Sequence, residues 1–282
     1  MTALQAHELI RPDATIQYWT GGTTGGSTVV LLHGATLDHR AWAPQIDALA
    51  ERFHLVLPDL RSHGTSTGEF DFEAAVDDVV ALLDELTAPR VVLVGLSLGA
   101  NIAQAVLYRD PARVSAVVLA DATRNTAARQ PLAAAMTVAM LNAQAMFTGD
   151  GFAHHAANLT ATDPGARAYI LAVNAHRTNK ETIAILSSLL TSALRPDPDY
   201  RLPVPALLVH GDRDSIGDIA TSTRAWAQSE PLAEYAVIPS AGHASNLDNP
   251  EVFTAVLLAF LDRVASTSPL ADVCREGQTG TS

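Results

Sequence analysis

Six short runs of consecutive apolar residues, separated by intervals long enough for helices, constrain the fold of this 282-residue chain most. Runs of this kind are typical of strands in a parallel sheet that is buried on both faces. Their alternation with helices predicts a three-layer α/β sandwich with a mostly parallel sheet and right-handed crossovers. The predicted strands cover residues 28–33, 54–58, 90–95, 115–120, 206–210 and 234–238.

The segments around these runs predict an edge hairpin and several core helices. Residues 8–10 and 15–20 alternate apolar and polar side chains, so we expect them to pair antiparallel at an edge of the sheet. Residues 72–86 carry an apolar stripe at helical spacing with acidic residues opposite. Residues 98–108 and 250–264 predict two further helices.

The interval from Thr123 to Pro203 breaks the alternation, because it contains helical patterns and no strand signal. A helical insertion between consecutive strands indicates a lid over the sheet edge; extra helices packed elsewhere on the core are the alternative. Helices are expected at 130–148, 164–178 and 181–194. The predicted organisation is an α/β core at 1–122 and 204–265, a helical lid at 123–203, and a flexible tail at 266–282.

The composition excludes several classes of protein. With 48% hydrophobic and 17% charged residues, the chain is too apolar to be disordered. The net charge of −12 argues against nucleic acid or an anionic membrane as a partner. Cys274 is the single cysteine, so an intramolecular disulfide is impossible and a disulfide-stapled secreted scaffold is excluded.

No segment of the sequence predicts membrane insertion or export. The most apolar long stretch, 132–147, is shorter than the roughly 20 residues that a membrane span needs. Residues 1–8 have neither a basic nor an apolar region of the kind found in a secretory signal. We therefore expect a cytoplasmic location. The sequence gives no indication of the oligomeric state.

The segment Gly95-Leu96-Ser97-Leu98-Gly99 is the sharpest chemical signal in the chain. It matches G-x-S-x-G and lies between a predicted strand and a predicted helix, which is the setting of a nucleophile elbow. Small residues there permit a tight turn that exposes the Ser97 hydroxyl at the carboxyl edge of the sheet. The alternative is an ordinary glycine turn with an incidental serine.

A serine hydroxyl needs a base, and the base needs an acid that orients it. We expect His243 to be the base, because its loop follows the last predicted strand and reaches the same edge. Asp214 is the preferred acid, and the order Ser97, Asp214, His243 is the order of the elbow motif. Asp212 and Asp121 remain alternative acids. The competing histidines at strand ends and in nearby loops are His33, His63 and His210.

An oxyanion hole needs two backbone N–H donors, and we expect them from Leu98 and Ala35. The substrate pocket is predicted to be apolar, lined by His33, Met136, Met140, Met146 and Phe147, although those lid residues fit a plain helix core as well. The adjacent pair His154-His155 would diverge on a helix, and no H-x-H or H-E-x-x-H string occurs. We therefore predict neither a metal nor a cofactor.

Several motifs in order make the chain resemble the α/β-hydrolase superfamily over most of residues 8–265. They are His33-Gly34 with Trp42 downstream, the loop Asp59 to Ser66, the elbow Gly95 to Gly99, the turn Gly211 to Asp214, and Gly242-His243 leading to Asn249-Pro250. Ser62 and Ala100 stand where the superfamily often has glycine. The resemblance implies an inserted lid over the catalytic edge.

The type of residue at the elbow limits which branches of the superfamily the chain resembles. Haloalkane dehalogenases and epoxide hydrolases of this fold use an aspartate nucleophile, so Ser97 argues against both. The segment His243 to Pro250 is similar to that of lactonases and small-ester hydrolases such as the 3-oxoadipate enol-lactonase group. Carbon–carbon bond hydrolases and cofactor-free haloperoxidases share much of it.

These observations predict a serine hydrolase that cleaves a small, apolar carboxylic ester or lactone through an acyl-enzyme. One alternative is a carbon–carbon bond hydrolase of the same fold. Another is a hydrolase-fold ligand receptor with little turnover. A metal-dependent lactonase is disfavoured, because the clustered ligands that it needs do not occur in the sequence.

Overall fold

The computed structural model describes residues 2–127, 136–143 and 151–266. One eight-stranded sheet runs through the molecule in the order β1-β2-β4-β3-β5-β6-β7-β8. The three pairs β3–β5, β5–β6 and β6–β7 at its centre are parallel. The strands are β1 (Gln5–Ile10), β2 (Thr15–Gly22), β3 (Thr28–Leu32), β4 (His54–Pro58), β5 (Val91–Leu96), β6 (Val114–Ala120), β7 (Ala206–Gly211) and β8 (Ala233–Ile238).

The strand predictions agree with this sheet, with one correction on burial. The six apolar runs coincide with β3 to β8, and the edge hairpin is β1 paired antiparallel with β2. β3, β5 and β7 are buried along their whole length, as expected. The expectation of burial on both faces is wrong for β8, where only Ile238 is buried, because β8 pairs on one side only and forms the sheet edge.

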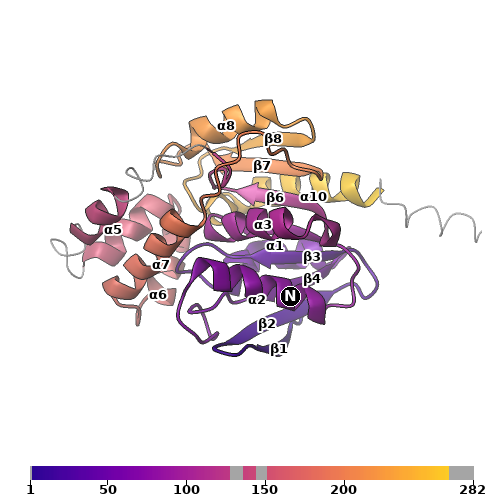
Figure 1. Ribbon diagram of the computed structural model, residues 1–282, viewed down its shortest axis with the longest axis horizontal. Helices are drawn as coiled ribbons and strands as arrows, with labels where there is room; N and C mark the ends of the chain where they lie inside the picture. The colour runs from indigo at the N-terminus through magenta and orange to yellow at the C-terminus, as the bar shows by residue number, and fades with distance from the viewer. Residues whose placement is uncertain (1, 128–135, 144–150, 267–282) are drawn as a thin grey trace, which may run out of the picture.

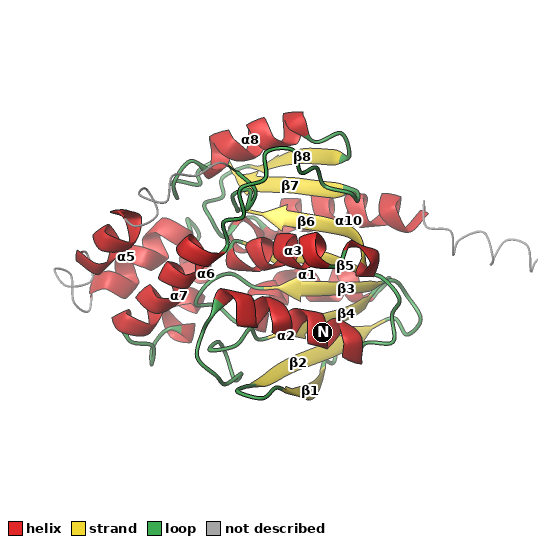
Figure 2. Cartoon of the chain, viewed as in Figure 1, coloured by secondary structure: helices red, strands yellow, loops and turns green. Residues whose placement is uncertain are grey.

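Helices cover both faces of the sheet and complete three layers (Figure 2). Helices α2 and α3 lie in front of the sheet in Figure 2, and α1 and α10 lie behind it. Successive residues of β3 serve opposite layers: Val30 packs with the α2 and α3 side, whereas Leu31 packs with the α10 side. The helices of the core are α1 (Ala43–Ala50), α2 (Phe72–Glu85), α3 (Leu98–Arg109), α8 (Ile219–Ser229), α9 (Ser245–Asp248) and α10 (Pro250–Ser266), with short 3-10 turns η1 (His39–Trp42) and η2 (Pro111–Arg113).

Three core helices, α1, α8 and the four-residue α9, were not predicted, and the apolar periodicity of α1 and α8 is weak. In α8 only Ile219, Thr223 and Trp226 are buried, and one of these is polar. In α1 the buried set includes the polar Gln45. By contrast, α2 buries a stripe of apolar residues at helical spacing, so the pattern there was legible.

Among the described residues, the stretch between β6 and β7 contains helices joined by loops and no strand, and we call residues 123–203 the insertion. Its helices are a segment at 136–143, α5 (Gly151–Thr160), α6 (Pro164–Val173) and α7 (Asn179–Ser192). Helix α5 was not predicted. The expected helix 164–178 is shorter in the structure: α6 ends at Val173 with Asn174 as its C-cap, and Thr178 is already the N-cap of α7. Figure 1 shows α5, α6 and α7 gathered at one end of the sheet.

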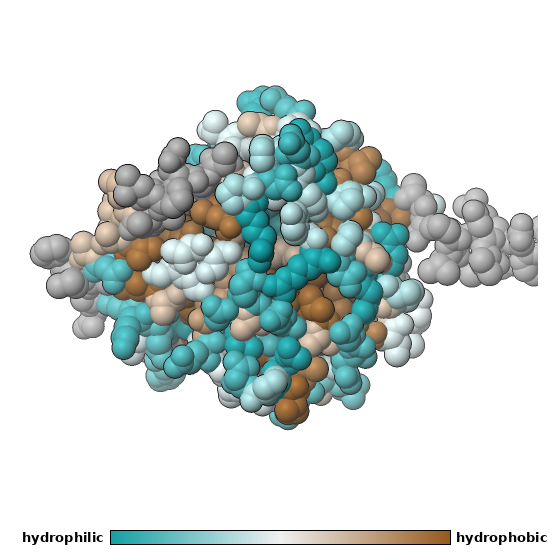
Figure 3. Space-filling model, in the orientation of Figure 1, coloured by the Kyte–Doolittle hydropathy of each residue, from teal (hydrophilic) through white to brown (hydrophobic). Residues whose placement is uncertain are grey.

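That end of the sheet is the end towards which the parallel strands run. The arrowheads of β3 and β6 in Figure 2 point towards α5, α6 and α7. On the face that Figure 3 shows, hydrophilic residues cover much of the core, and hydrophobic residues gather beside the helices of the insertion. Among the described residues, no helix is both long and apolar enough to cross a membrane.

Candidate active site

The turn between β5 and α3 holds Ser97 in a strained backbone conformation, with φ of 51° and ψ of −113°. Such a conformation costs of order 1–3 kcal/mol for a residue other than glycine. A Cβ on Gly95 would lie 2.4 Å from the Ala100 amide nitrogen, and one on Gly99 would lie 2.2 Å from the Leu32 carbonyl oxygen. Both positions therefore require glycine, and the turn leaves Ser97 partly exposed at the end of β5.

Three side chains from distant parts of the sequence meet at this turn. The Nε2 atom of His243 lies 2.8 Å from the Ser97 hydroxyl oxygen, and its Nδ1 lies 2.9 Å from Oδ2 of Asp214. The Asp214 side chain is fully buried, and its Oδ1 accepts a hydrogen bond of 2.9 Å from the Ile216 N–H. With Nδ1–H donating to Asp214, Nε2 is free to accept the proton of Ser97.

The surroundings of His243 favour its protonated form. Burial of the ring lowers its pKa, but the hydrogen bond that the ring donates to Asp214 and the charges of Asp214 and Asp121 outweigh burial. The pKa of His243 therefore lies above its ordinary value. This arrangement stabilises an imidazolium, which is the charge that forms when the ring takes a proton from Ser97.

The two alternative acids have other partners. Asp212 is exposed, and its Oδ1 accepts a hydrogen bond from the Ala241 N–H at 3.1 Å. Asp121 is fully buried; it accepts from the Gly211 N–H at 2.9 Å and from the Ser245 hydroxyl at 2.6 Å. Burial raises the pKa of Asp121 to about 7. Asp121 thus joins the end of β7 to the loop that follows His243.

The competing histidines, His33, His63 and His210, form hydrogen bonds with groups other than Ser97. Each places one ring nitrogen 2.8 Å from a main-chain carbonyl oxygen and the other within 3.0 Å of a further backbone or side-chain group. His33 is fully buried between Gly34 and Leu60, and burial lowers its pKa. The structure therefore gives His33 a bracing role in the strand-end turn and does not bring it to the cavity described below, contrary to the pocket prediction.

The two expected oxyanion donors lie at the ends of neighbouring strands. Leu98 begins α3 directly after Ser97, and Ala35 follows β3, which pairs with β5. Among the described residues, neither backbone N–H has a hydrogen-bond acceptor. The adjacent Thr36 has a φ of 62° and donates its N–H to His63 Nε2 at 2.9 Å, which fixes the loop that carries Ala35.

A cavity of about 50 Å³ lies between this loop and the helices of the insertion, and we call it the Arg177 cavity. Met136 and Met140 do not line it; their side chains are 59% and 71% exposed, because helix 136–143 turns them to solvent. Met146 and Phe147 lie outside the described residues. The lining residues are Ala35, Thr36, Leu37, Phe152, Ala153, Ala156, Thr160, Ile170, Asn174, Arg177, Asn179 and Thr182.

The loop that carries the histidine is tied to the insertion by main-chain and carboxylate contacts. Asp248 accepts hydrogen bonds from the Gly242 N–H at 2.7 Å and from the Asp163 N–H at 2.8 Å. The Ala244 N–H donates to the Thr160 carbonyl at 2.8 Å. These hydrogen bonds therefore attach the residues on either side of His243 to the junction of α5 and α6. No sequence pattern pointed to this role of Asp248.

One group of side chains has the composition of a metal site. Asp38, His39 and Asp59 bring potential ligand atoms within 4.8 Å of one another. Each carboxylate is already engaged: Asp59 Oδ1 lies 2.8 Å from His39 Nδ1, and Asp38 forms an ion pair with Arg40 at 2.5 Å and accepts from the Tyr169 hydroxyl at 3.0 Å. These contacts join η1 to the loop after β4 and to α6.

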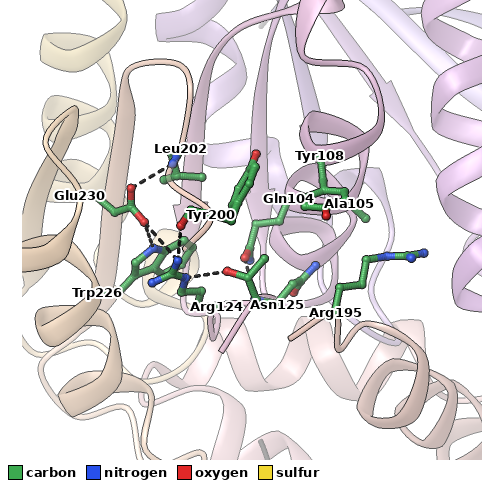
Figure 4. A pocket seen from close by; sticks show the side chains of 11 residues that line it. Gln104, Ala105, Tyr108, Arg124, Asn125, Arg195, Tyr200, Leu202, Trp226 and Glu230 are labelled. Carbon is green, nitrogen blue, oxygen red and sulfur yellow. Dashed lines mark hydrogen bonds and ion pairs between the residues drawn. The ribbon is translucent and has the colours of Figure 1, made fainter. Parts of the chain in front are cut away.

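A second polar cavity, the Glu230 cavity, lies away from Ser97 between α3, α8 and the end of the insertion (Figure 4). Its volume of about 10 Å³ matches a single water molecule, and the buried Tyr200 hydroxyl has no hydrogen-bond partner within the described part of the chain. Glu230 accepts from the Trp226 indole at 2.9 Å and from the Leu202 N–H at 2.9 Å, with Arg124 at 3.8 Å (Figure 4).

A mostly parallel sheet with a serine on a strained strand-to-helix turn, bonded through a histidine to a buried carboxylate, is characteristic of the α/β-hydrolase class of enzymes. Comparison with known proteins agrees: the Alpha/beta hydrolase family matches residues 29–256. The chain belongs to this family and is a hydrolase.

Individual relatives are similar over most of their length. A pimeloyl-[acyl-carrier protein] methyl ester esterase of Nitrosospira multiformis is 26% identical, over 83% of this chain and 94% of its own. The 3-oxoadipate enol-lactonase 2 of Acinetobacter baylyi is 24% identical, over 90% and 96%. Among solved structures, a thermophilic esterase from Thermogutta terrifontis superposes with a TM-score of 0.78 at 26% identity, over 93% and 99%.

Proposed function

We propose that this protein is a serine hydrolase that cleaves a small carboxylic ester or lactone through an acyl-enzyme. The observation that carries the proposal is the hydrogen-bonded series from the Ser97 hydroxyl through His243 to the buried Asp214. In this proposal Ser97 is the nucleophile, His243 the general base and Asp214 the residue that orients it.

The chemistry follows from the positions of these atoms. As Ser97 Oγ attacks the carbonyl carbon, its proton passes to His243 Nε2, and the C=O electron pair moves to the carbonyl oxygen. The tetrahedral intermediate collapses, the alkoxide leaving group takes the proton from His243, and an ester of Ser97 remains. Water then attacks this ester, gives a proton to His243, and releases the acid with Ser97 restored.

The developing oxyanion needs donors that no other group uses. The N–H groups of Leu98 and Ala35 meet this condition among the described residues, and Leu98 lies at the positive end of α3. We assign them to the oxyanion hole. Helices α5, α6 and α7 act as the lid, since they lie beyond the carboxyl ends of the strands and line the Arg177 cavity together with Ala35.

The choice of an ester or lactone rests on the nucleophile and on the relatives. A serine nucleophile with a histidine base suits acyl transfer to water. The relatives named above are an esterase of an acyl-carrier-protein methyl ester and an enol-lactonase. Both names describe hydrolysis of the C–O bond at a carbonyl carbon, a reaction that Ser97, His243 and Asp214 can perform.

A substrate panel tests the proposal. Purified protein should hydrolyse short-chain p-nitrophenyl esters or lactones, and a fluorophosphonate should label Ser97. The Ser97→Ala variant should retain its fold by circular dichroism while losing both turnover and labelling. Retained turnover in Ser97→Ala would show that another residue is the nucleophile.

The same panel separates the alternatives. Preferential cleavage of β-diketones would indicate a carbon–carbon bond hydrolase. Absence of turnover on every substrate, together with an unlabelled Ser97, would indicate a hydrolase-fold receptor and would end the enzymatic assignment of these three residues.

A further inference from the structure

The Arg177 cavity contains a cation without an anionic partner. One terminal nitrogen of Arg177, Nη2, donates to the Ser62 carbonyl at 2.8 Å, whereas Nε is buried and has no hydrogen-bond partner among the described residues. Within the described parts of the chain, no carboxylate lies at ion-pair distance from Arg177. A buried guanidinium nitrogen that lacks an acceptor loses its hydration without compensation, so an arriving acceptor is favoured.

The carboxylate whose charge acts on Arg177, that of Glu181, has another function. Glu181 is exposed, and its Oε2 accepts from the Thr178 N–H at 2.7 Å in the capping box of α7. Burial lowers the pKa of Arg177, and the charge of Glu181 opposes this only in part. The positive charge therefore remains unneutralised on the cavity side.

The surroundings of Arg177 do not reduce the positive potential of the cavity: the N-terminal end of α7 adds to it, and His63 leaves it unchanged. Asn179 and Thr182, in the first turns of α7, line the cavity, and the N-terminal end of a 14-residue helix attracts anions. Burial, followed by the charges of His33 and Arg177, lowers the pKa of His63 well below its ordinary value. His63, which accepts from the Thr36 N–H, is thus neutral and adds no charge beside Arg177.

A second buried atom in the cavity lining also lacks a partner. Asn174 donates from Nδ2 to the Ile170 carbonyl at 2.8 Å, and its Oδ1 is buried without a hydrogen bond. A buried amide oxygen calls for a hydroxyl, an N–H or a water molecule. The lining thus offers a charged donor and a neutral acceptor from adjacent turns of the insertion.

We infer that the Arg177 cavity binds a carboxylate group of the substrate, so that the ester or lactone that the enzyme cleaves also carries an acid. Arg177 and the N-terminal turn of α7 hold the carboxylate, and Asn174 Oδ1 accepts from a hydroxyl, an N–H or a water beside it. The inference rests on the proposed function and adds its substrate class. Ala35 lines the same cavity and supplies a proposed oxyanion donor, so the acid and the reacting carbonyl belong to one small molecule.

Two esters of matched length test the inference. One is the mono-p-nitrophenyl ester of glutaric acid, which carries a carboxylate at its far end; the other is p-nitrophenyl pentanoate, which is neutral. We expect the native enzyme to favour the acidic ester by about tenfold or more in kcat/KM, because a charge-assisted hydrogen bond to a partly buried guanidinium is a strong one.

Three variants identify the residue responsible. Arg177→Met should lower kcat/KM for the acidic ester about 10- to 100-fold more than for the neutral ester, mainly through KM. Asn174→Asp places a carboxylate in the cavity while keeping Arg177 and its bond to Ser62, so it should remove the preference in the same way. Arg224→Met, which removes one positive charge from the exposed face of α8, is the matched control and should change neither ester.

A binding measurement gives a readout that does not depend on turnover. Glutarate should raise the Tm of the Ser97→Ala protein, and this rise should disappear in the Ser97→Ala variant that also carries Arg177→Met. Equal loss on both esters in Arg177→Met, an unchanged preference in Asn174→Asp, or glutarate binding that survives Arg177→Met would each overturn the inference. A neutral ester that is hydrolysed while no preference exists would overturn the inference and leave the proposed function; inactivity on both esters with Ser97 unlabelled would overturn the proposed function.

Discussion

The Glu230 and Arg177 cavities are each lined by a partly buried arginine, and they differ in how the charge of that arginine is balanced. In the Glu230 cavity, Arg124 lies 3.8 Å from Glu230, which also accepts two further hydrogen bonds (Figure 4). In the Arg177 cavity, the guanidinium donates to the Ser62 carbonyl and has no carboxylate partner among the described residues. A buried charge that the fold itself neutralises serves as a brace, whereas one left without a counter-charge is suited to a ligand.

The largest effect is expected at the proposed nucleophile, Ser97. Ser97→Ala should lower kcat by about 10⁴-fold or more, because the remaining groups cannot form the acyl-enzyme. Steady-state kinetics on a p-nitrophenyl ester measures this loss. The Tm should stay close to that of the native protein, since alanine fits a partly exposed turn. Persistent hydrolysis in Ser97→Ala would show that Ser97 is not the nucleophile.

Replacing the orienting acid should act almost as strongly. Asp214→Asn should lower kcat by about 10⁴-fold, because the asparagine amide favours the wrong tautomer of His243. Asp212→Asn is the matched control, since that carboxylate is exposed and bonds Ala241, and its kcat should stay within about threefold. A large loss in the control with little loss in Asp214→Asn would exchange the roles of these two aspartates.

Breaking the brace in the Glu230 cavity should affect stability and leave specificity unchanged. Glu230→Gln should lower the free energy of unfolding by about 2–4 kcal/mol, because Arg124 loses its counter-charge and one buried donor loses its acceptor. Urea denaturation measures this change. Glu234→Gln, in an ion pair with Arg263 that is about half exposed, should cost about 1 kcal/mol or less. Similar losses in the two variants would contradict the bracing role.

The pH dependence should follow the raised pKa of His243. Activity requires the neutral ring, so kcat/KM should fall about tenfold per pH unit on the acid side, with an apparent pKa above about 6.5. The His243–Asp214 interaction contributes stability that is fully present below about pH 6.5 and is lost as the pH rises through the folded-state pKa. An acid limb well below 6.5 would show that the two carboxylates do not act on the ring.

The smallest effect is expected from Arg177→Met on stability without ligand. Losing the bond to Ser62 destabilises the protein, but removing a partly buried, unneutralised charge offsets this, so the free energy of unfolding should change by about 1 kcal/mol or less. Urea denaturation alongside Glu230→Gln provides the comparison. A loss as large as that of Glu230→Gln would make Arg177 a brace like Arg124.

Much of the core was predictable, because burial on both faces leaves continuous apolar runs in the sequence. β3, β5 and β7 are such strands, and α2 shows a clear apolar stripe. Prediction failed where burial is one-sided or polar. β8 has an apolar sequence but lies at an exposed edge, and α8 buries too few apolar residues to show a period.

The candidate site was also predictable only in part: the nucleophile was clear from the sequence, whereas the choice of the acid was not. Ser97 was predictable because local sterics demand the glycines at 95 and 99, and that demand is written in consecutive residues. The choice of Asp214 over Asp212 and Asp121 was left open, because all three follow strands at the same sheet edge. Their hydrogen bonds separate them: of these three aspartates, Asp214 bonds the His243 ring, whereas Asp212 accepts from Ala241 and Asp121 from Gly211.

The sequence by itself therefore determined the layers of the core, the strained serine turn and the order of the three candidate catalytic residues. These depend on local backbone geometry and on the period of apolar side chains. Only the tertiary structure decided which aspartate faces the histidine, that His33 is enclosed, that Met136 and Met140 face solvent, and that Arg177 lacks a counter-charge. The physical reason is that burial and electrostatic partnership arise between segments far apart in the chain, which no local pattern records.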